Sequence, residues 1–142
     1  IKAITLLPNV LLRQQAEDRD VSEAILVRDG HVLEGSASNV FIIRNGIITT
    51  PPNGPEILPG VTRDLVIELA KKQQMACETR PINVTELHQA EEIWVTSSTR
   101  EINAVTRLND QPVGEGQPGP VWHIMVDLYE RYKDAVRAGK AH

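Results

Sequence analysis

Two dipeptides that favour tight β-hairpin turns lie in the first fifty residues, Asp29-Gly30 and Asn45-Gly46. A type I′ turn needs positive φ at both central residues, and Asn, Asp and Gly adopt it most readily. Short apolar runs flank each pair. The predicted strands are Ala24 to Val27, His31 to Leu33, Asn39 to Ile43 and Ile47 to Thr50. The pattern predicts a β-meander over residues 24–50.

Other segments carry the periodicity of amphipathic helices. The predicted helices are Pro8 to Asp18, Val61 to Gln74, Thr85 to Gln89 and Pro120 to Ala138. Apolar faces are expected from Val61, Leu65, Val66 and Leu69, and from Val121, Met125, Leu128 and Tyr132. The further predicted strands are Glu92 to Thr96, with Ile93 and Val95 on one face and Trp94 on the other, and Ile102 to Leu108. This mixture predicts a mixed α/β domain.

Composition excludes several classes of protein. The 142 residues suit one domain, and 41% hydrophobic and 24% charged residues are ordinary for a globular protein. A net charge of −4 argues against a nucleic-acid partner. The lone Cys77 permits neither an internal disulfide nor a zinc pattern and fits a reducing, cytoplasmic compartment. We also expect no metal site. No apolar run approaches the ~20 residues of a membrane span, so we expect no membrane partner.

Two segments could bind an anion. Gly60-Val61-Thr62 opens the predicted 61–74 helix, where N–H groups without helical partners and the positive dipole end favour phosphate. Thr96 to Thr99 is a run of hydroxyl residues after an apolar strand. Taken alone, each segment is better explained as an ordinary helix start or a solvated turn. Lys2 and Glu34, taken singly, are also ordinary surface charges.

The combination of segments is more specific. Glu34-Gly-Ser-Ala-Ser-Asn-Val-Phe41, a hairpin, a Pro-rich loop over 51–59, and Ile57-Leu-Pro-Gly-Val-Thr-Arg63 follow one another. With the run from Ile1 to Leu12 and the segment from Ser97 to Arg107, they resemble the class IV aminotransferases of pyridoxal-phosphate (PLP) fold type IV. The resemblance covers essentially the whole chain. Ala37 departs from it, since relatives often carry a third Ser there.

The resemblance implies a D-amino acid aminotransferase-like C-terminal domain, a β-meander or pseudo-barrel with surrounding helices, that binds pyridoxal 5'-phosphate. Lys2 would be the catalytic Schiff-base lysine, and Glu34 would pair with the pyridine nitrogen. The remaining implied cofactor contacts are Ser38, Asn39, Leu58, Gly60, Val61, Thr62, Ser97, Ser98 and Thr99. The chemistry is consistent, because PLP is an electron sink while its ring nitrogen is protonated, and a nearby carboxylate favours that state.

The implied reaction is transamination of D-amino acids such as D-alanine, with a 2-oxo acid acceptor such as 2-oxoglutarate. Alternatives on the same fold are an aminodeoxychorismate lyase and a branched-chain L-amino acid aminotransferase. A PLP-binding or interaction domain without turnover is a third reading, which intact Lys2 and Glu34 disfavour. We expect residues 1–142 to be the larger C-terminal domain, preceded by a smaller N-terminal domain and assembled as a homodimer.

Overall fold

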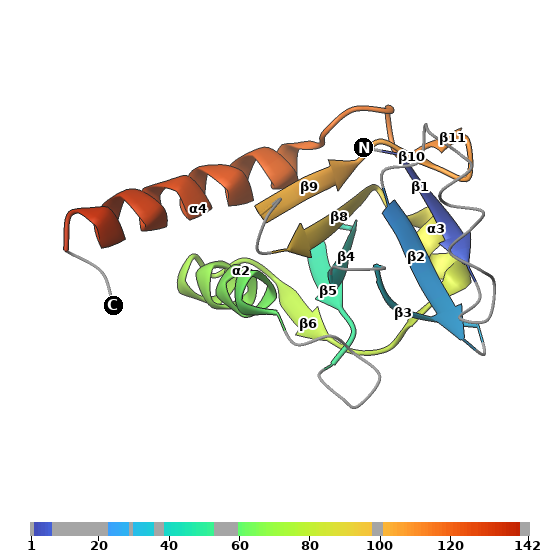
Figure 1. Ribbon diagram of the computed structural model, residues 1–142, viewed down its shortest axis with the longest axis horizontal. Helices are drawn as coiled ribbons and strands as arrows, with labels where there is room; N and C mark the ends of the chain where they lie inside the picture. The colour runs from blue at the N-terminus through green and yellow to red at the C-terminus, as the bar shows by residue number, and fades with distance from the viewer. Residues whose placement is uncertain are drawn as a thin grey trace.

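The computed structural model describes residues 2–6, 23–28, 30–35, 39–52, 60–97 and 101–139. Its strands form two sheets (Figure 1). The first contains β1 (Lys2–Leu6), β2 (Glu23–Arg28), β3 (His31–Gly35), β7 (Ile82–Asn83), β10 (Arg107–Leu108) and β11 (Gln111–Pro112), in the order β11-β10-β1-β2-β3-β7. The second contains β4 (Asn39–Arg44), β5 (Ile47–Thr50), β6 (Cys77–Thr79), β8 (Glu92–Ser97) and β9 (Glu101–Val105), in the order β6-β5-β4-β8-β9.

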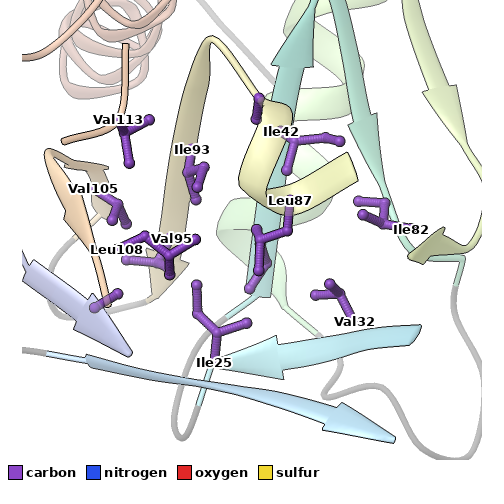
Figure 2. Packing of buried hydrophobic residues seen from close by; sticks show 13 residues of the cluster. Ile25, Val32, Ile42, Ile82, Leu87, Ile93, Val95, Val105, Leu108 and Val113 are labelled. Atoms are coloured by element: carbon purple, nitrogen blue, oxygen red, sulfur yellow. The ribbon is translucent and has the colours of Figure 1, made fainter. Parts of the chain in front are cut away.

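The two sheets enclose one hydrophobic core. Ile25 comes from the first sheet, and Ile93 and Val95 come from the second. Helix α3 (Val84–Gln89) contributes Leu87, which points into the same cluster (Figure 2). The expected mixed α/β fold with surrounding helices is therefore confirmed.

A second core covers the opposite face of the β4–β8 sheet. Helices α2 (Val61–Lys72) and α4 (Pro120–Arg137) lie together on that face (Figure 1). Phe41 and Trp94 pack there with ring centroids 6.0 Å apart, and Met125 of α4 is fully buried against them. Trp94 thus faces the helices, while its neighbours Ile93 and Val95 face the other sheet, as the alternation in β8 predicts.

Both predicted hairpins are present. Strands β2 and β3 pair antiparallel, as do β4 and β5, and φ is +52° at Asn45 and +77° at Gly46. The predicted continuous meander, however, is divided, because β3 and β4 belong to different sheets. Val32 of β3 and Ile42 of β4 therefore enter the same core from different sheets, rather than lying side by side within one sheet.

The predicted strand from Ile102 to Leu108 is likewise two strands. β9 pairs with β8, whereas β10 pairs in parallel with β1 in the other sheet. The break at Thr106 lets Val105 and Leu108 enter the same core from opposite sheets. Asn109 and Asp110 then adopt positive φ in the turn to β11, where the sequence places the strand end.

The helices follow their predicted spacing with one exception. Val66 and Leu69 of α2 are buried, but Val61 is 86% exposed, so its assignment to the apolar face is wrong. At 100° per residue, Val61 falls on the side of α2 opposite its buried residues, which are Thr62, Arg63, Val66, Leu69 and Ala70. In α4, Val121, Leu128 and Tyr132 pack against the second core as expected.

Capping residues mark the start of α3 and the end of α4. Asn83 caps α3 through a capping box with Glu86. Ala138 caps α4, and Gly139 follows with φ of +74°. The predicted helix over residues 8–18 and most of the Pro-rich loop, residues 53–59, lie outside the described residues. Among the helices that are described, none is long and apolar enough to cross a membrane.

Candidate cofactor-binding site

The start of α2 presents backbone N–H groups that its own hydrogen bonds do not use. Gly60 is the N-cap and provides no side-chain cap. The first helical bond runs from the Asp64 N–H to the Gly60 carbonyl oxygen over 3.1 Å, so the amides of residues 61–63 precede the helical ladder. Such a terminus attracts an anion through its N–H groups and its dipole.

Gly60 and Asn39 are in close contact. A Cβ on Gly60 would overlap the amide oxygen of Asn39, so this approach requires glycine. Asn39 is buried at the first position of β4, where it is aligned with Thr96 of β8. The start of α2, the start of β4 and the end of β8 therefore meet at one place.

Thr62 connects the helix to the end of β8. It is buried, and its hydroxyl donates to the Ser97 carbonyl oxygen at 3.2 Å. The structure thus brings together five predicted cofactor contacts, Asn39, Gly60, Val61, Thr62 and Ser97. Four others, Ser38, Leu58, Ser98 and Thr99, lie outside the described residues.

Arg63 holds this helix start in place. Its side chain is buried, and Nη2 donates to the Pro51 carbonyl oxygen at 2.8 Å while Nη1 meets the Asp64 carboxylate at 2.9 Å. Pro51 follows directly on β5, so the guanidinium fixes α2 against the neighbouring strand. Sequence reasoning included Arg63 in the motif without assigning it a role, and its burial could not be read from a charged residue in a helix.

Lys2 and Glu34 lie on strands of the first sheet, with β2 between them. Lys2 begins β1, in register with Arg107, and Glu34 is in β3, in register with Leu26. Their side chains fall outside what the structure describes, so the pairing of each with the cofactor stays a prediction.

Asn109 forms hydrogen bonds with β1, the strand that carries Lys2. Its side-chain oxygen accepts from the Thr5 N–H at 2.9 Å, and its side-chain nitrogen donates to the Thr5 hydroxyl at 3.0 Å. Its backbone N–H donates to the Ala3 carbonyl oxygen at 2.8 Å. Asn109 therefore continues the hydrogen bonding of β1 beyond the short strand β10.

Sequence reasoning missed one buried polar side chain in α4. Tyr129 is only 9% exposed and packs in the second core. Burial, and then the neighbouring Glu101, raises the pKa of Tyr129 above its usual 10.0. The helical spacing pointed to Tyr132 instead, because a buried phenol has no signal of its own in a helical pattern.

A match that extends over most of the chain shows the family to which it belongs. Residues 1–108 match the family model described as amino-transferase class IV. The chain belongs to the class IV aminotransferases. These enzymes depend on pyridoxal phosphate and act on amino acids and keto acids.

Several relatives share this similarity. A D-alanine aminotransferase of Bacillus licheniformis is 40% identical over 121 residues, which is 85% of this chain and 43% of that protein. A putative branched-chain-amino-acid aminotransferase of Methanocaldococcus jannaschii is 36% identical over 135 residues, or 94% of this chain and 46% of that protein. The crystal structure of a putative branched-chain amino acid aminotransferase from Thermotoga maritima has a TM-score of 0.80 at 30% identity, and the match covers 91% of this chain and 54% of that one. The chain therefore spans about half the length of the proteins it matches.

Proposed function

We propose that this chain binds PLP and that the protein to which it belongs catalyses transamination. The observation that carries the proposal is the start of α2, where uncapped amides, Asn39 and the end of β8 converge. A phosphate group fits this geometry, because the helix terminus supplies N–H donors and Thr62 supplies a hydroxyl beside them. Ser98 and Thr99, which follow directly in the sequence, would complete the phosphate contacts from the turn after β8.

The chemistry divides among a few groups of this chain. PLP, when bound, supplies the electron sink. Lys2 would hold the cofactor covalently and, once released, carry a proton at its Nζ between two carbon atoms. Glu34 would keep the proton on the ring nitrogen through a charge-assisted hydrogen bond. Leu58 would contact the ring face, and Ser38, with Asn39, would line the cofactor side of the turn that precedes β4.

The proposed substrates are D-amino acids such as D-alanine, with a 2-oxo acid such as 2-oxoglutarate as acceptor. The supporting observation is the 40% identity to a protein named D-alanine aminotransferase. Transamination of branched-chain L-amino acids is the second candidate, favoured by the 36% identity to a putative enzyme of that name.

The decisive measurement is a coupled assay on the intact protein. We expect 2-oxo acid to form from D-alanine with 2-oxoglutarate, and little turnover of L-leucine under the same conditions. Turnover of L-leucine alone would establish the second candidate. Turnover of neither substrate by a PLP-loaded protein would refute both proposals.

The position of the cofactor has its own test. Borohydride reduction of the PLP-loaded protein followed by peptide mapping should place the phosphopyridoxyl group on Lys2. A label on Lys71, Lys72, Lys133 or Lys140 would refute the assignment.

We also propose that residues 1–142 form the larger C-terminal domain of a cytoplasmic homodimer. The support is the partial coverage of the relatives, the resemblance of the motifs and the lone Cys77. Sedimentation of the intact protein as a monomer at all concentrations would contradict the dimer.

A further inference from the structure

Asn109 lies in a tight turn but uses its side chain outside that turn. With Asp110 it joins β10 to β11, and φ is +50° at Asn109 and +67° at Asp110. Few side chains adopt this left-handed conformation readily, and those of Asn and Asp are among them. A carboxylate can only accept hydrogen bonds, whereas the Asn amide both donates and accepts them. Position 109 thus combines a turn conformation with a side chain that can pair with a strand edge.

The strand edge with which Asn109 pairs is that of β1. Asn109 Oδ1 accepts from the Thr5 N–H at 2.9 Å, and its Nδ2 donates to the Thr5 hydroxyl at 3.0 Å. Its backbone N–H donates to the Ala3 carbonyl oxygen at 2.8 Å. The three distances all lie in the range of well-formed protein hydrogen bonds. One turn residue therefore holds two positions of β1.

These hydrogen bonds matter because β10 is short. In the described part of the chain, β10 aligns with only two residues of β1, as Arg107 is in register with Lys2 and Leu108 with Ala3. The other edge of β1 is paired with β2 as far as Leu6. On the β10 side, the Asn109 side chain extends the pairing to Thr5, two residues beyond the last register partner.

The turn that carries Asn109 is itself held in place. Leu108, at the end of β10, is buried in the core, and Arg107 Nη2 donates to the Asp110 carbonyl oxygen at 2.6 Å. The Asn109 amide therefore starts from a fixed position, and its hydrogen bonds set the position of β1 along this edge. Because Lys2 belongs to the same strand, a shift of β1 also shifts the backbone of Lys2.

We infer that Asn109 is a positioning residue for Lys2, because it fixes the strand that carries this lysine. The inference rests on the proposed function, since it takes Lys2 as the residue that holds PLP covalently. In that attachment the neutral Nζ bonds to the aldehyde carbon, and the aldehyde oxygen leaves as water with the two Nζ protons. A misplacement of about 1 Å can slow such a reaction roughly 10²-fold. Loss of Asn109 should therefore slow the attachment and leave the non-covalent contacts at the start of α2 intact.

The test separates covalent attachment from non-covalent binding in the apo form of the intact protein. Deoxypyridoxine phosphate has the ring and the phosphate of PLP but a methyl group in place of the aldehyde, so its dissociation constant reports the non-covalent contacts alone. The attachment rate is measured by stopped-flow absorbance at saturating PLP, and borohydride reduction with peptide mapping gives its position. We expect Asn109→Gly, which keeps the positive φ without strain, to slow attachment roughly 10–10²-fold with unchanged affinity for deoxypyridoxine phosphate.

Two matched variants separate positioning from a general effect on the turn. Asp110→Gly removes an exposed side chain that has no hydrogen bond to β1 among the described residues, so it should change neither quantity. Asn109→Asp keeps an acceptor for the Thr5 N–H, and the Thr5 hydroxyl can turn to donate to it, so most of the attachment rate should return. The Thr5 amide should also exchange with solvent faster in Asn109→Gly than in the wild type.

Each outcome bears on a different claim. An unchanged attachment rate in Asn109→Gly, an equal loss of affinity for deoxypyridoxine phosphate, or equal slowing by Asp110→Gly would overturn the inference. If Asn109→Gly fails to fold, the same criteria apply to Thr5→Val, which removes only the hydroxyl contact and should slow attachment less. Wild-type protein that binds deoxypyridoxine phosphate but does not attach PLP at Lys2 would refute the role of Lys2. Wild-type protein that binds neither ligand would refute the proposed function itself.

Discussion

Glu92 is the residue whose loss should destabilise the fold most clearly through hydrogen bonds. It is 7% exposed at the start of β8, and its carboxylate accepts three hydrogen bonds. Two come from the first turn of α4, from the Val121 N–H at 3.0 Å and the Trp122 N–H at 2.8 Å. The third comes from the Trp94 indole at 3.1 Å. Gly119, the N-cap of α4, has no side chain to cap the helix, so Glu92 does so from another element.

The cost of Glu92→Ala follows from the surroundings of the three donors. The two helix amides are partly exposed and can bind water. Losing their hydrogen bonds to Glu92 therefore resembles the loss of an N-cap residue, which costs about 1–2 kcal/mol. The Trp94 indole is fully buried, and leaving its N–H without an acceptor costs about 1–3 kcal/mol. We therefore expect a loss of about 3 kcal/mol, with a fall in Tm of roughly 6–12 °C. Glu92→Gln keeps one acceptor oxygen and should cost about half as much.

Urea unfolding of the apo protein at neutral pH, followed by circular dichroism, measures this free energy. Glu115→Ala is a suitable control, because this exposed glutamate lies near the same helix start and its loss should change stability by less than about 0.5 kcal/mol. A Glu92→Ala variant within 1 kcal/mol of the wild type would show that water replaces the carboxylate without penalty. The assignment of Glu92 as the cap of α4 would then be wrong.

Three further predictions concern the candidate site. Gly60→Ala should force Asn39 to move, at about 1–3 kcal/mol, and weaken PLP binding; unchanged affinity and Tm would argue against a close-packed helix start. Subtracting the alkaline absorption titration of Tyr129→Phe from that of the wild type isolates the ionisation of the Tyr129 phenol, which should occur above pH 10. The stabilising effect of the neutral phenol is present below pH 10 and is lost as pH rises through the raised pKa, and an ionisation below 10 would contradict its burial. Glu34→Gln should bind PLP nearly normally yet slow the half-reaction with D-alanine by roughly 10²–10⁴-fold, and an unchanged rate would place the cofactor elsewhere.

Local patterns predicted the elements well. The alternation in β8, the Asn-Gly turn at 45–46 and the short helix near 85–89 each depend on neighbouring residues, and the structure contains all three. Their physics is local, because turn conformation and helix capping are decided within a few residues. The contacts of the PLP motif came from the family resemblance instead, and the structure brings five of the predicted residues together.

The predictions that were wrong or missing concern features that depend on distant parts of the chain. The strand break at Thr106 follows from the parallel pairing of β10 with β1, which no pattern near residue 106 reveals. The exposure of Val61 follows from which side of α2 packs against the second core. The ion pair between Glu101 of β9 and Lys133 of α4 joins elements far apart in the sequence, so only the assembled fold shows it.

The pairing of β1 also bears on how the chain assembles during synthesis. One neighbour of this strand, β2, is made soon after it, but the other, β10, is made about a hundred residues after β1. At about 5–20 residues per second, one edge of β1 stays open for on the order of ten seconds. An open edge can pair with other chains until it is covered. The strand that carries Lys2 thus completes its sheet only when Asn109 closes it, late in the growth of this chain.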